Sequence, residues 1–500
     1  MGIAALVAVP IIYLVIRASD GRGGLGALAD PAFGVLVVRT LALALVVGVI
    51  ATVIALGLAV VIEADDLPLR RVATILVVMP LAIPSYVAAT AYVAGMSPLG
   101  PLGALLAKLG IGPVFPEGFA WAVFVLVTST VPLAFLPLRA ALARADGDLY
   151  DAARTLGRSQ TAALVTALRP VVGRAARGGF VIVVLYTLAE LGTVAILRVD
   201  ALPRVIYHQF LSAFDRAAAS RAALVLVALV LVVVIFAGGA RHGDPAGDRG
   251  RPLRLRLGRG RWLAAVPLVG YVLVATCVPL VSLASWLVKT PNAGAGLGRA
   301  IAGSLQAAAI VVVPSLVAAV IVAIVAERGG RAGRGIARFV ETGFALPGLV
   351  VALGLSVATL RLAPGLYAGW VPYTLAMMLL YVPLGVAAIR GSLATVSPAI
   401  EEAARTLGAT RRQAFWRVTL PIVRPGVLAA AALIVISTMK ELGASLLLIP
   451  TGKTTLAVKL WDGAEEARYG HAAAPALVLI LLAGIAAFAV ERRRIARSPA

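Results

Sequence analysis

Residues 35–62 read VLVVRTLALALVVGVIATVIALGLAVVI, and the only ionisable side chain in this run is Arg39. About 20 such residues cross a bilayer core as a helix, because a helix satisfies all its backbone N–H and C=O groups internally. Residues 222–239 form a similar run. Over the 500 residues, 61% are apolar and 14% charged, against roughly half and a quarter in soluble domains. The sequence therefore predicts an all-α integral membrane protein.

Apolar runs along the whole chain predict about twelve transmembrane helices. The first run is short, but it lacks a positively charged start and a small-residue cleavage site, so we interpret it as a retained helix and not a signal peptide. The twelve candidate spans are residues 3–17, 35–62, 72–95, 119–138, 172–197, 221–240, 262–288, 301–326, 336–360, 371–389, 422–449 and 472–490.

Lysine and arginine concentrate in every second loop between these spans. The positive-inside rule assigns such loops to the cytoplasm, so we expect both termini there. The net charge of +22 is dispersed over these loops and forms no single basic face. We therefore expect contact with membrane lipid and none with nucleic acid.

An internal repeat organises the chain. Residues 150–157, YDAARTLG, reappear 251 residues later as residues 401–408, EEAARTLG, and the same spacing carries Pro132 onto Pro383. Nearer the N-terminus the spacing is 264 residues, which carries Glu63 onto Glu327. Each copy holds an even number of spans, so the two tandem repeats are parallel. The expected parts are a first repeat (1–240, with a loop at 146–170), a basic linker (241–261), a second repeat (262–490, with a loop at 397–421) and a basic tail (491–500).

The repeated segment is predicted to be a short surface helix. In the second copy, Ser397 and Pro398 are typical of a helix start, and two glutamates in the first turn suit the helix dipole. Small alanines allow close approach of another surface, a glycine can end the helix with φ > 0, and Thr410 can cap a second helix over 411–417. A docking surface and an ordinary amphipathic helix both fit this pattern. The docking candidates are Asp151, Ala152, Ala153 and Gly157 in the first copy, and Glu401, Glu402, Ala403, Ala404 and Gly408 in the second.

These residues resemble a known family. Glu402-Ala403-Ala404, Gly408 and the later Val418-Thr419-Leu420-Pro421 match the EAA loop of bacterial ABC-importer permeases. In that family the loop forms the coupling helix, which docks on the ATP-hydrolysing subunit. We therefore call residues 146–170 and 397–421 the first and second coupling loops. The first departs from the pattern, with Asp151 in place of glutamate, so the resemblance implies docking at both loops with unequal contacts.

The resemblance also implies the partners. They are two copies of an ABC ATPase subunit and a periplasmic or lipid-anchored substrate-binding protein, around a multi-pass permease in a bacterial inner membrane. No enzymatic activity and no cofactor are expected of this chain, and the partner ATPase would use ATP-Mg. Residues 452–454, GKT, imitate the end of a phosphate-binding loop, but Leu447 stands where that motif needs its first glycine.

The cargo is inferred from a weaker resemblance. Residues 439–450, MKELGASLLLIP, look most like ferric-iron permeases, although that family usually has a proline where Gly443 stands. Thiamine, polyamine, sulfate and other small solutes stay open. The rival classes are an ion-coupled secondary transporter, powered through two intramembrane glutamates, and a membrane-embedded enzyme, for which the sequence offers no catalytic constellation.

The two intramembrane glutamates, Glu190 and Glu441, occupy equivalent positions in the two copies. A charge near the bilayer centre costs at least about 2.5–3.5 kcal/mol, so such residues usually face a bundle interior or an aqueous path. Both are candidates for the translocation path, and the alternative is a purely structural role. Metal ligands are unknown. Polar residues in the predicted outer loops are interpreted as solvated or as contacts for a binding protein ahead of iron ligands: Tyr207, Asp215, Asp462, Glu465, Glu466 and Tyr469.

Overall fold

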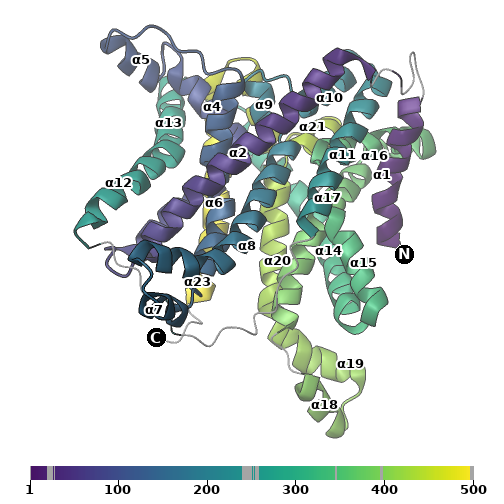
Figure 1. The fold of residues 1–500 in the computed structure, drawn as a ribbon. Coiled ribbons are helices and arrows are strands. Elements are labelled where there is room, and N and C mark those ends of the chain that lie inside the picture. The colour runs from purple at the N-terminus through teal and green to yellow at the C-terminus, as the bar shows by residue number, and fades with distance from the viewer. Residues whose placement is uncertain are drawn as a thin grey trace.

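The computed structural model describes residues 2–19, 26, 29–238, 251, 253, 258–343, 346–394 and 398–495, and regular secondary structure in these ranges is helical (Figure 1). The first half contains α1 (Gly2–Ser19), α2 (Pro31–Glu63), α3 (Arg70–Val78), the 3-10 turn η2 (Met79–Ala82), α4 (Ser85–Met96), α5 (Pro101–Lys108), α6 (Phe119–Leu142), α7 (Gly147–Thr155), α8 (Gln160–Ala189), α9 (Gly192–Ile196), α10 (Leu202–Leu211) and α11 (Arg216–Gly238).

The second half begins after the short turn η3 (Gly258–Gly260). It contains α12 (Arg261–Val272), the π-helical turn η4 (Leu273–Cys277), α13 (Val278–Lys289), α14 (Leu297–Arg328), α15 (Gly330–Thr342), α16 (Gly348–Leu362), η6 (Pro364–Leu366), α17 (Trp370–Leu393), α18 (Pro398–Thr406), α19 (Arg411–Ala414), the π-helical turn η7 (Phe415–Thr419), α20 (Leu420–Lys440), α21 (Gly443–Leu448), α22 (Leu456–Glu465) and α23 (Tyr469–Ile495).

The membrane-spanning helices match the predicted runs. Among the described residues, eight helices are long and apolar enough to cross a membrane. One further pair of helical segments, Arg70–Ala82 and Ser85–Lys108, is long and apolar enough when taken together, but the pair bends by 88°. Three shorter apolar helices are Val9–Ser19, Gly348–Leu362 and Tyr469–Ile485. Each predicted span falls on one of these, which confirms the expected fold of about twelve helices.

Four predicted spans are broken where the sequence reading had continuous helices: 72–95, 172–197, 336–360 and 422–449. Pro84 lies at the first break and Pro347 caps the helix after the third. Proline lacks a backbone donor and disfavours helix in the residue before it. The other two breaks lie at Glu190 and Glu441, where the backbone is extended. The helix predicted over 411–417 does not end there either, because α19 continues through η7 into α20.

The repeat is visible in the helix boundaries. α6 and α17 begin and end 251 residues apart, and so do α7 and α18. α8 corresponds in the same way to the run from α19 to α20. Farther toward the N-terminus, α2 corresponds to α14 at the 264-residue spacing, with starts that differ by two residues.

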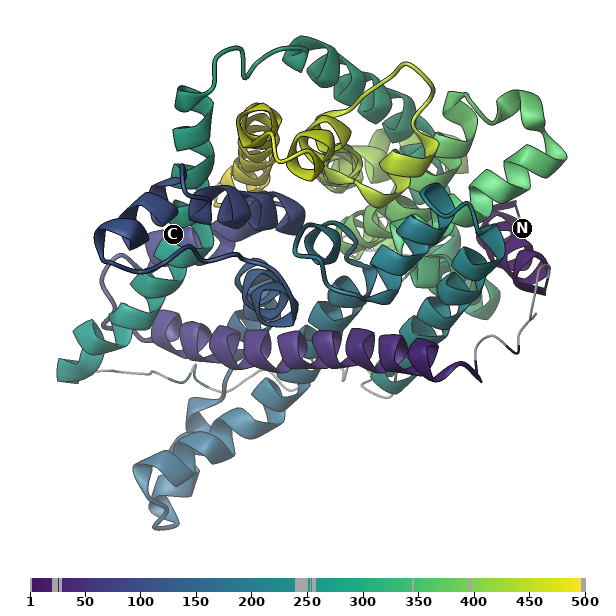
Figure 2. The same ribbon diagram turned by 90° about the horizontal axis from the view of Figure 1, so that it is seen from above.

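The two halves interlock. α2, α6 and α8 pack together in the first half, as α14, α17 and α20 do in the second. The opening helices cross over: α1 packs against α16, while α13 packs against α4, on the side of the bundle where α12 approaches α2 (Figure 2). The largest hydrophobic core contains residues of both halves, from Leu43 to Ile480. Since each half completes the packing of the other, the chain forms one membrane-embedded body.

Candidate functional site: two coupling loops and two central helix breaks

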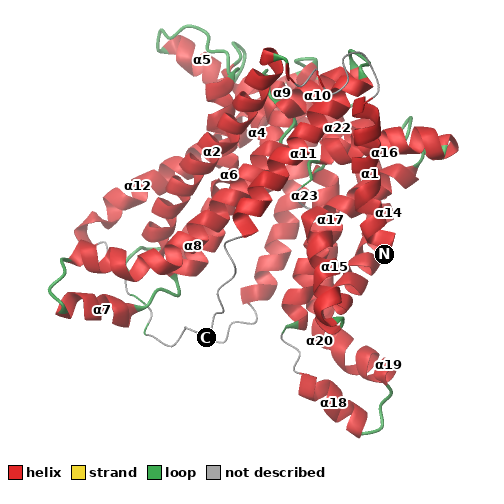
Figure 3. Ribbon diagram, turned by 45° about the vertical axis from the view of Figure 1, so that its right-hand side comes forward, coloured by secondary structure: helices red, strands yellow, loops and turns green. Residues whose placement is uncertain are grey.

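The coupling loops contain two matching helices, α7 and α18, which project from the same end of the bundle (Figures 1 and 3). Asp146 is the N-cap of α7, and its side chain accepts a hydrogen bond from the backbone N–H of Asp148 at 2.8 Å. Ser397, the predicted cap of α18, lies outside the described residues. Thr410 caps α19 as predicted, because its hydroxyl accepts from the N–H of Gln413 at 3.2 Å while the Gln413 side chain accepts from the N–H of Thr410 at 2.9 Å.

The predicted docking residues form a similar surface on both helices. Asp151, Ala152 and Gly157 are exposed in the first loop and Ala153 is buried, whereas Glu402, Ala403 and Gly408 are exposed in the second and Ala404 is half-buried. The side chain of Glu401 lies outside the described part. Sequence reasoning missed the leucine before each glycine. Leu156 is 82% exposed and Leu407 88% exposed, and their shared T-L-G context was the available signal.

Each helix ends at a glycine in the left-handed region, as predicted. Gly157 has φ +78° and Gly408 has φ +89°. A Cβ added at either position would meet no atom within 4 Å. The glycines are therefore required by backbone conformation and not by packing, since residues with a side chain rarely adopt these angles. This turn directs the chain back toward the membrane and leaves the leucine at the tip.

The first coupling loop has a partner within the chain that sequence reasoning missed. Arg251, in the linker, lies with its guanidinium 2.8 Å from the Asp151 carboxylate and 3.5 Å from that of Asp148. Its carbonyl accepts from the N–H of Gly147 at 2.7 Å, and the N–H of Leu253 donates to the carbonyl of Ala145 at 2.9 Å. The linker thus pairs with the start of α7. No ion pair to Glu402 is found within the described ranges.

A repeated ion pair joins the helices that lead into each loop. In the first copy, Glu63 at the end of α2 bonds Arg139 at 2.9 Å and also contacts Arg70. In the second copy, Glu327 bonds Arg390 at 3.0 Å. The Glu63 side chain is 7% exposed and that of Glu327 is 45% exposed. The sequence repeat had aligned these residues without indicating that they touch.

Glu190 and Glu441 lie at the central helix breaks and adopt the same local geometry. Glu190 accepts hydrogen bonds from the Thr193 N–H at 3.0 Å and from its hydroxyl at 3.1 Å. Glu441 accepts from the Ala444 N–H at 3.1 Å and from the Tyr381 hydroxyl at 2.6 Å. Each carboxylate therefore caps the short helix that follows it, α9 or α21, and both side chains are half-buried. Broken helices inside a transporter are tolerated where they are buried in protein or line a cavity.

Lys440 joins the halves beside these breaks. Its ammonium donates to the carbonyl of Leu81 in η2 at 2.8 Å, and its own carbonyl accepts from the Tyr86 hydroxyl at 3.2 Å. The Lys440 ammonium therefore contacts the other half of the chain. The packing around Gly192, just after the break at Glu190, is tight. A Cβ added to Gly192 would lie 2.4 Å from the Cβ of Tyr86 and 2.9 Å from the side chain of Leu442.

The outer polar residues have structural contacts. Tyr207 packs edge-on against Trp461, and Tyr469 against Trp286. The Asp215 side chain caps α11, and Glu466 pairs with Arg468. Burial, with a smaller effect of Glu465, raises the pKa of Tyr207 to about 12, and burial also raises the pKa of Asp462. Within the described residues, no group of three or more His, Cys, Asp and Glu side chains could hold a metal ion.

The amino-acid sequence is similar to those of known transport proteins. Residues 315–494 match the family described as the binding-protein-dependent transport system inner membrane component. The chain is 28% identical over 404 residues to an Fe(3+)-transport system permease protein of Haemophilus influenzae, covering 76% of this chain and 80% of that protein.

Other relatives match over shorter stretches. The sulfate transport system permease of Escherichia coli is 38% identical over 113 residues, which are 20% of this chain and 40% of that protein. The molybdenum transport system permease of the same organism is 39% identical over 77 residues, 15% of this chain and 34% of that protein.

Proposed function

We propose that this chain supplies both transmembrane halves of a binding-protein-dependent ABC importer, with ferric iron as the cargo. The observation that carries the proposal is the pair of coupling loops. α7 and α18 have the same length, the same glycine turn and the same exposed leucine, and they lie at the same end of the bundle. Two matched surfaces suit two copies of one partner.

In the proposed mechanism each ATPase subunit docks on one loop. The exposed Leu156 and Leu407 enter a groove on the ATPase, where burial of each side chain would contribute apolar contact area to the docked interface. ATP-Mg is bound and hydrolysed by the ATPase. Movement of the docked helices passes into α8 and α20, which end at Glu190 and Glu441. The two breaks then lie where the halves meet, so a relative shift of the halves alternates access to the path.

Both termini and the linker are placed in the cytoplasm, because α7 and α18 must face the ATPase. The opposite end of the bundle receives a periplasmic or lipid-anchored binding protein. In this proposal the repeats divide near residues 240 and 262, and the linker between them belongs with the first coupling loop through Arg251.

Ferric iron is supported by coverage and by chemistry. The iron permease aligns over 76% of the chain, against 20% for the sulfate permease. Ferric iron is a hard cation that favours oxygen ligands. The two helix breaks adjoin, because a Cβ on Gly192 would lie 2.9 Å from Leu442, and they carry the carboxylates of Glu190 and Glu441, the latter bonded to the Tyr381 hydroxyl. The relatives named for sulfate and molybdenum keep oxyanions as the second candidate cargo.

The test is reconstitution of the full chain with its ATPase in proteoliposomes. We expect ATP-dependent ferric-iron uptake when the binding protein is present. Changing Asp151, Gly157, Glu402 and Gly408 together should abolish association with the ATPase. A control substitution, Glu117→Gln, removes an exposed carboxylate at the opposite end and should leave association intact. Association that survives the fourfold change would refute docking at these loops, and uptake without any ATPase would favour a secondary transporter.

A further inference from the structure

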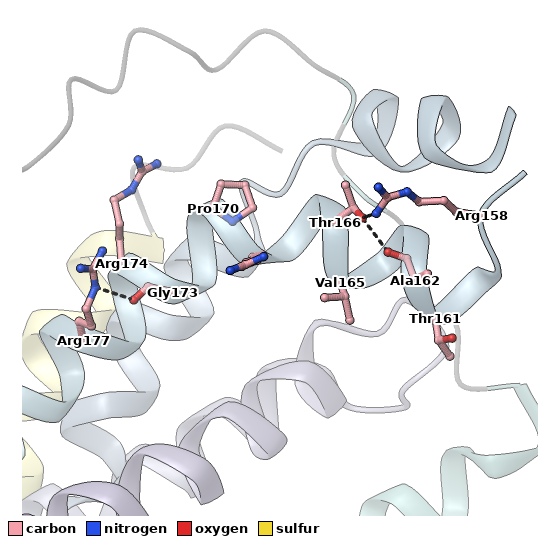
Figure 4. A pocket seen from close by; sticks show the side chains of 10 residues that line it. Arg158, Thr161, Ala162, Val165, Thr166, Pro170, Gly173, Arg174 and Arg177 are labelled. Atoms are coloured by element: carbon pink, nitrogen blue, oxygen red, sulfur yellow. Dashed lines mark hydrogen bonds between the residues drawn. The ribbon is translucent and has the colours of Figure 1, made fainter. Parts of the chain in front are cut away.

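An open groove of about 950 Å³ runs along the beginning of α8, from the last part of the first coupling loop to Arg177 (Figure 4). Four of its lining residues are arginines, and no carboxylate is among the residues that line it. The lining residues are Arg158, Thr161, Ala162, Val165, Thr166, Arg169, Pro170, Gly173, Arg174 and Arg177. We call this surface the arginine groove.

The positive charge of the arginine groove is not neutralised by the protein in the described ranges. Arg158 donates to the Thr166 hydroxyl at 2.9 Å, and Arg177 donates to the carbonyl of Gly173 at 3.3 Å. Both acceptors are uncharged, and no ion pair joins any of the four arginines to a described carboxylate. All four side chains are exposed. A guanidinium presents its donors in a planar fork that suits a phosphate better than a single carbonyl does.

The groove lies where α8 passes from its polar to its apolar part. Arg177 is the last basic residue before the break at Glu190. Glu190 follows Arg177 by 13 positions, which correspond to about 20 Å of helix, most of the depth of a bilayer core. The arginines therefore lie at the level of the headgroups on the coupling-loop side. Val165, which is 61% exposed, and Pro170 add apolar surface to the same groove.

The corresponding segment of the second half is also basic, but its arginines do not align with those of the arginine groove. Arg412, Arg417 and Arg424 stand 251 residues after the groove residues Thr161, Thr166 and Gly173. All three are exposed. The charge of this helix segment is thus present in both halves while the individual arginines differ. This pattern favours a ligand that is bound mainly through charge at a membrane surface. A partner protein that recognises individual side chains would need the arginines at the same positions in both halves.

We propose that the arginine groove is a binding site for the phosphate headgroup of an anionic membrane lipid. The guanidinium groups hold the phosphate, and the apolar part of the groove covers the glycerol and the start of an acyl chain. Basic pockets beside transmembrane helices are suited to such headgroups. A lipid in this place would connect the first coupling loop to the bilayer, since the short turn at Gly157 joins α7 to α8. This inference does not depend on the cargo or on ATP.

The test uses the full chain in phosphatidylcholine nanodiscs with a titrated fraction of phosphatidylglycerol. Lipid retained after mild detergent exchange is counted by native mass spectrometry. The variant is Arg169→Gln/Arg174→Gln/Arg177→Gln. The control, Lys108→Gln/Arg299→Gln/Lys453→Gln, removes the same charge from exposed positions in other segments. We expect the groove variant to weaken phosphatidylglycerol retention by more than about tenfold and the control to change it less than about twofold.

Three results would overturn the proposal. The first is an equal loss in both variants, because the effect would then be one of net charge. The second is protection of the groove arginines from a guanidine-modifying reagent by inorganic phosphate in pure phosphatidylcholine, with no added effect of phosphatidylglycerol, because the site would then take a free anion. The third is unchanged lipid retention together with lost ATPase association, because the groove would then be an ATPase contact.

Discussion

Replacing the glycine that ends each coupling helix should weaken ATPase docking without unfolding the permease. Gly408 has φ +89°, and a Cβ at this position would meet nothing within 4 Å. Gly408→Ala therefore adds no clash, and its only cost is the left-handed backbone conformation. That cost is about 1–2 kcal/mol for a residue with a side chain, and Gly157→Ala should cost the same because its surroundings are equally open.

The size of the affinity loss depends on whether the strained turn can relax in the free protein and in the complex. In the free protein the exposed loop can relax out of the strained turn, whereas docking requires the native turn again. The strain then appears as lost affinity, about 5- to 30-fold for each loop. Asparagine tolerates this region better than alanine, so Gly408→Asn should lose less affinity than Gly408→Ala.

The assay is the dissociation constant of the ATPase for the permease in nanodiscs, with Tm measured in parallel. Gly110→Ala is the matched control, because Gly110 has φ +74°, has equally open surroundings and lies after α5 at the opposite end of the bundle. We expect Tm to stay within about 2 °C in all variants. Equal affinity losses for Gly110→Ala and Gly408→Ala, or none in the double variant at 157 and 408, would refute this reasoning.

Three further substitutions test other parts of the site. Glu63→Gln should lower stability by about 3 kcal/mol because it breaks a largely buried ion pair, whereas the more exposed Glu327→Gln should cost about 0.2–1 kcal/mol; thermal unfolding measures both, and equal losses would contradict the difference in burial. Lys440→Met removes one hydrogen bond between the halves, worth about 1.5–3 kcal/mol for a charged donor, and should reduce transport by uncoupling the halves; full transport would show that the contact is dispensable. Arg251→Ala should bring the dissociation constants of the ATPase for the two coupling loops closer together, as measured by titration calorimetry. Unchanged dissociation constants would show that the linker does not affect the first loop.

The fold was predictable to the extent that it depends on hydrophobicity and on the repeat. The boundaries of α6 and α17 follow from apolar runs that end at polar loops, and the 251-residue spacing aligns them. The helix breaks were harder to predict from the sequence, because Glu190 and Glu441 lie within runs that are apolar enough to be interpreted as one continuous span. At each break the glutamate carboxylate caps the next helix by accepting from a backbone N–H three residues later. A hydropathy profile does not indicate such a contact.

The candidate site was predictable in its positions but not in its partners. The glycine turns and the exposed faces of α7 and α18 follow from local sequence, because they depend on residues a few positions apart. The contact of Arg251 with Asp151 and that of Lys440 with Leu81 join residues 100 and 359 positions apart. Contacts of this separation depend on how the halves pack, and a single sequence does not indicate them.

The central claim is that energy enters through two loops on the cytoplasmic side, and thiol labelling tests it most directly. Asp151→Cys and Glu402→Cys are made separately in a background in which Cys277, the only native cysteine, is replaced by serine. An impermeant maleimide is applied to right-side-out and inside-out vesicles. The account predicts that both positions label only in inside-out vesicles and that the ATPase protects both. Labelling of the two positions from opposite sides, or no protection at either, would contradict it.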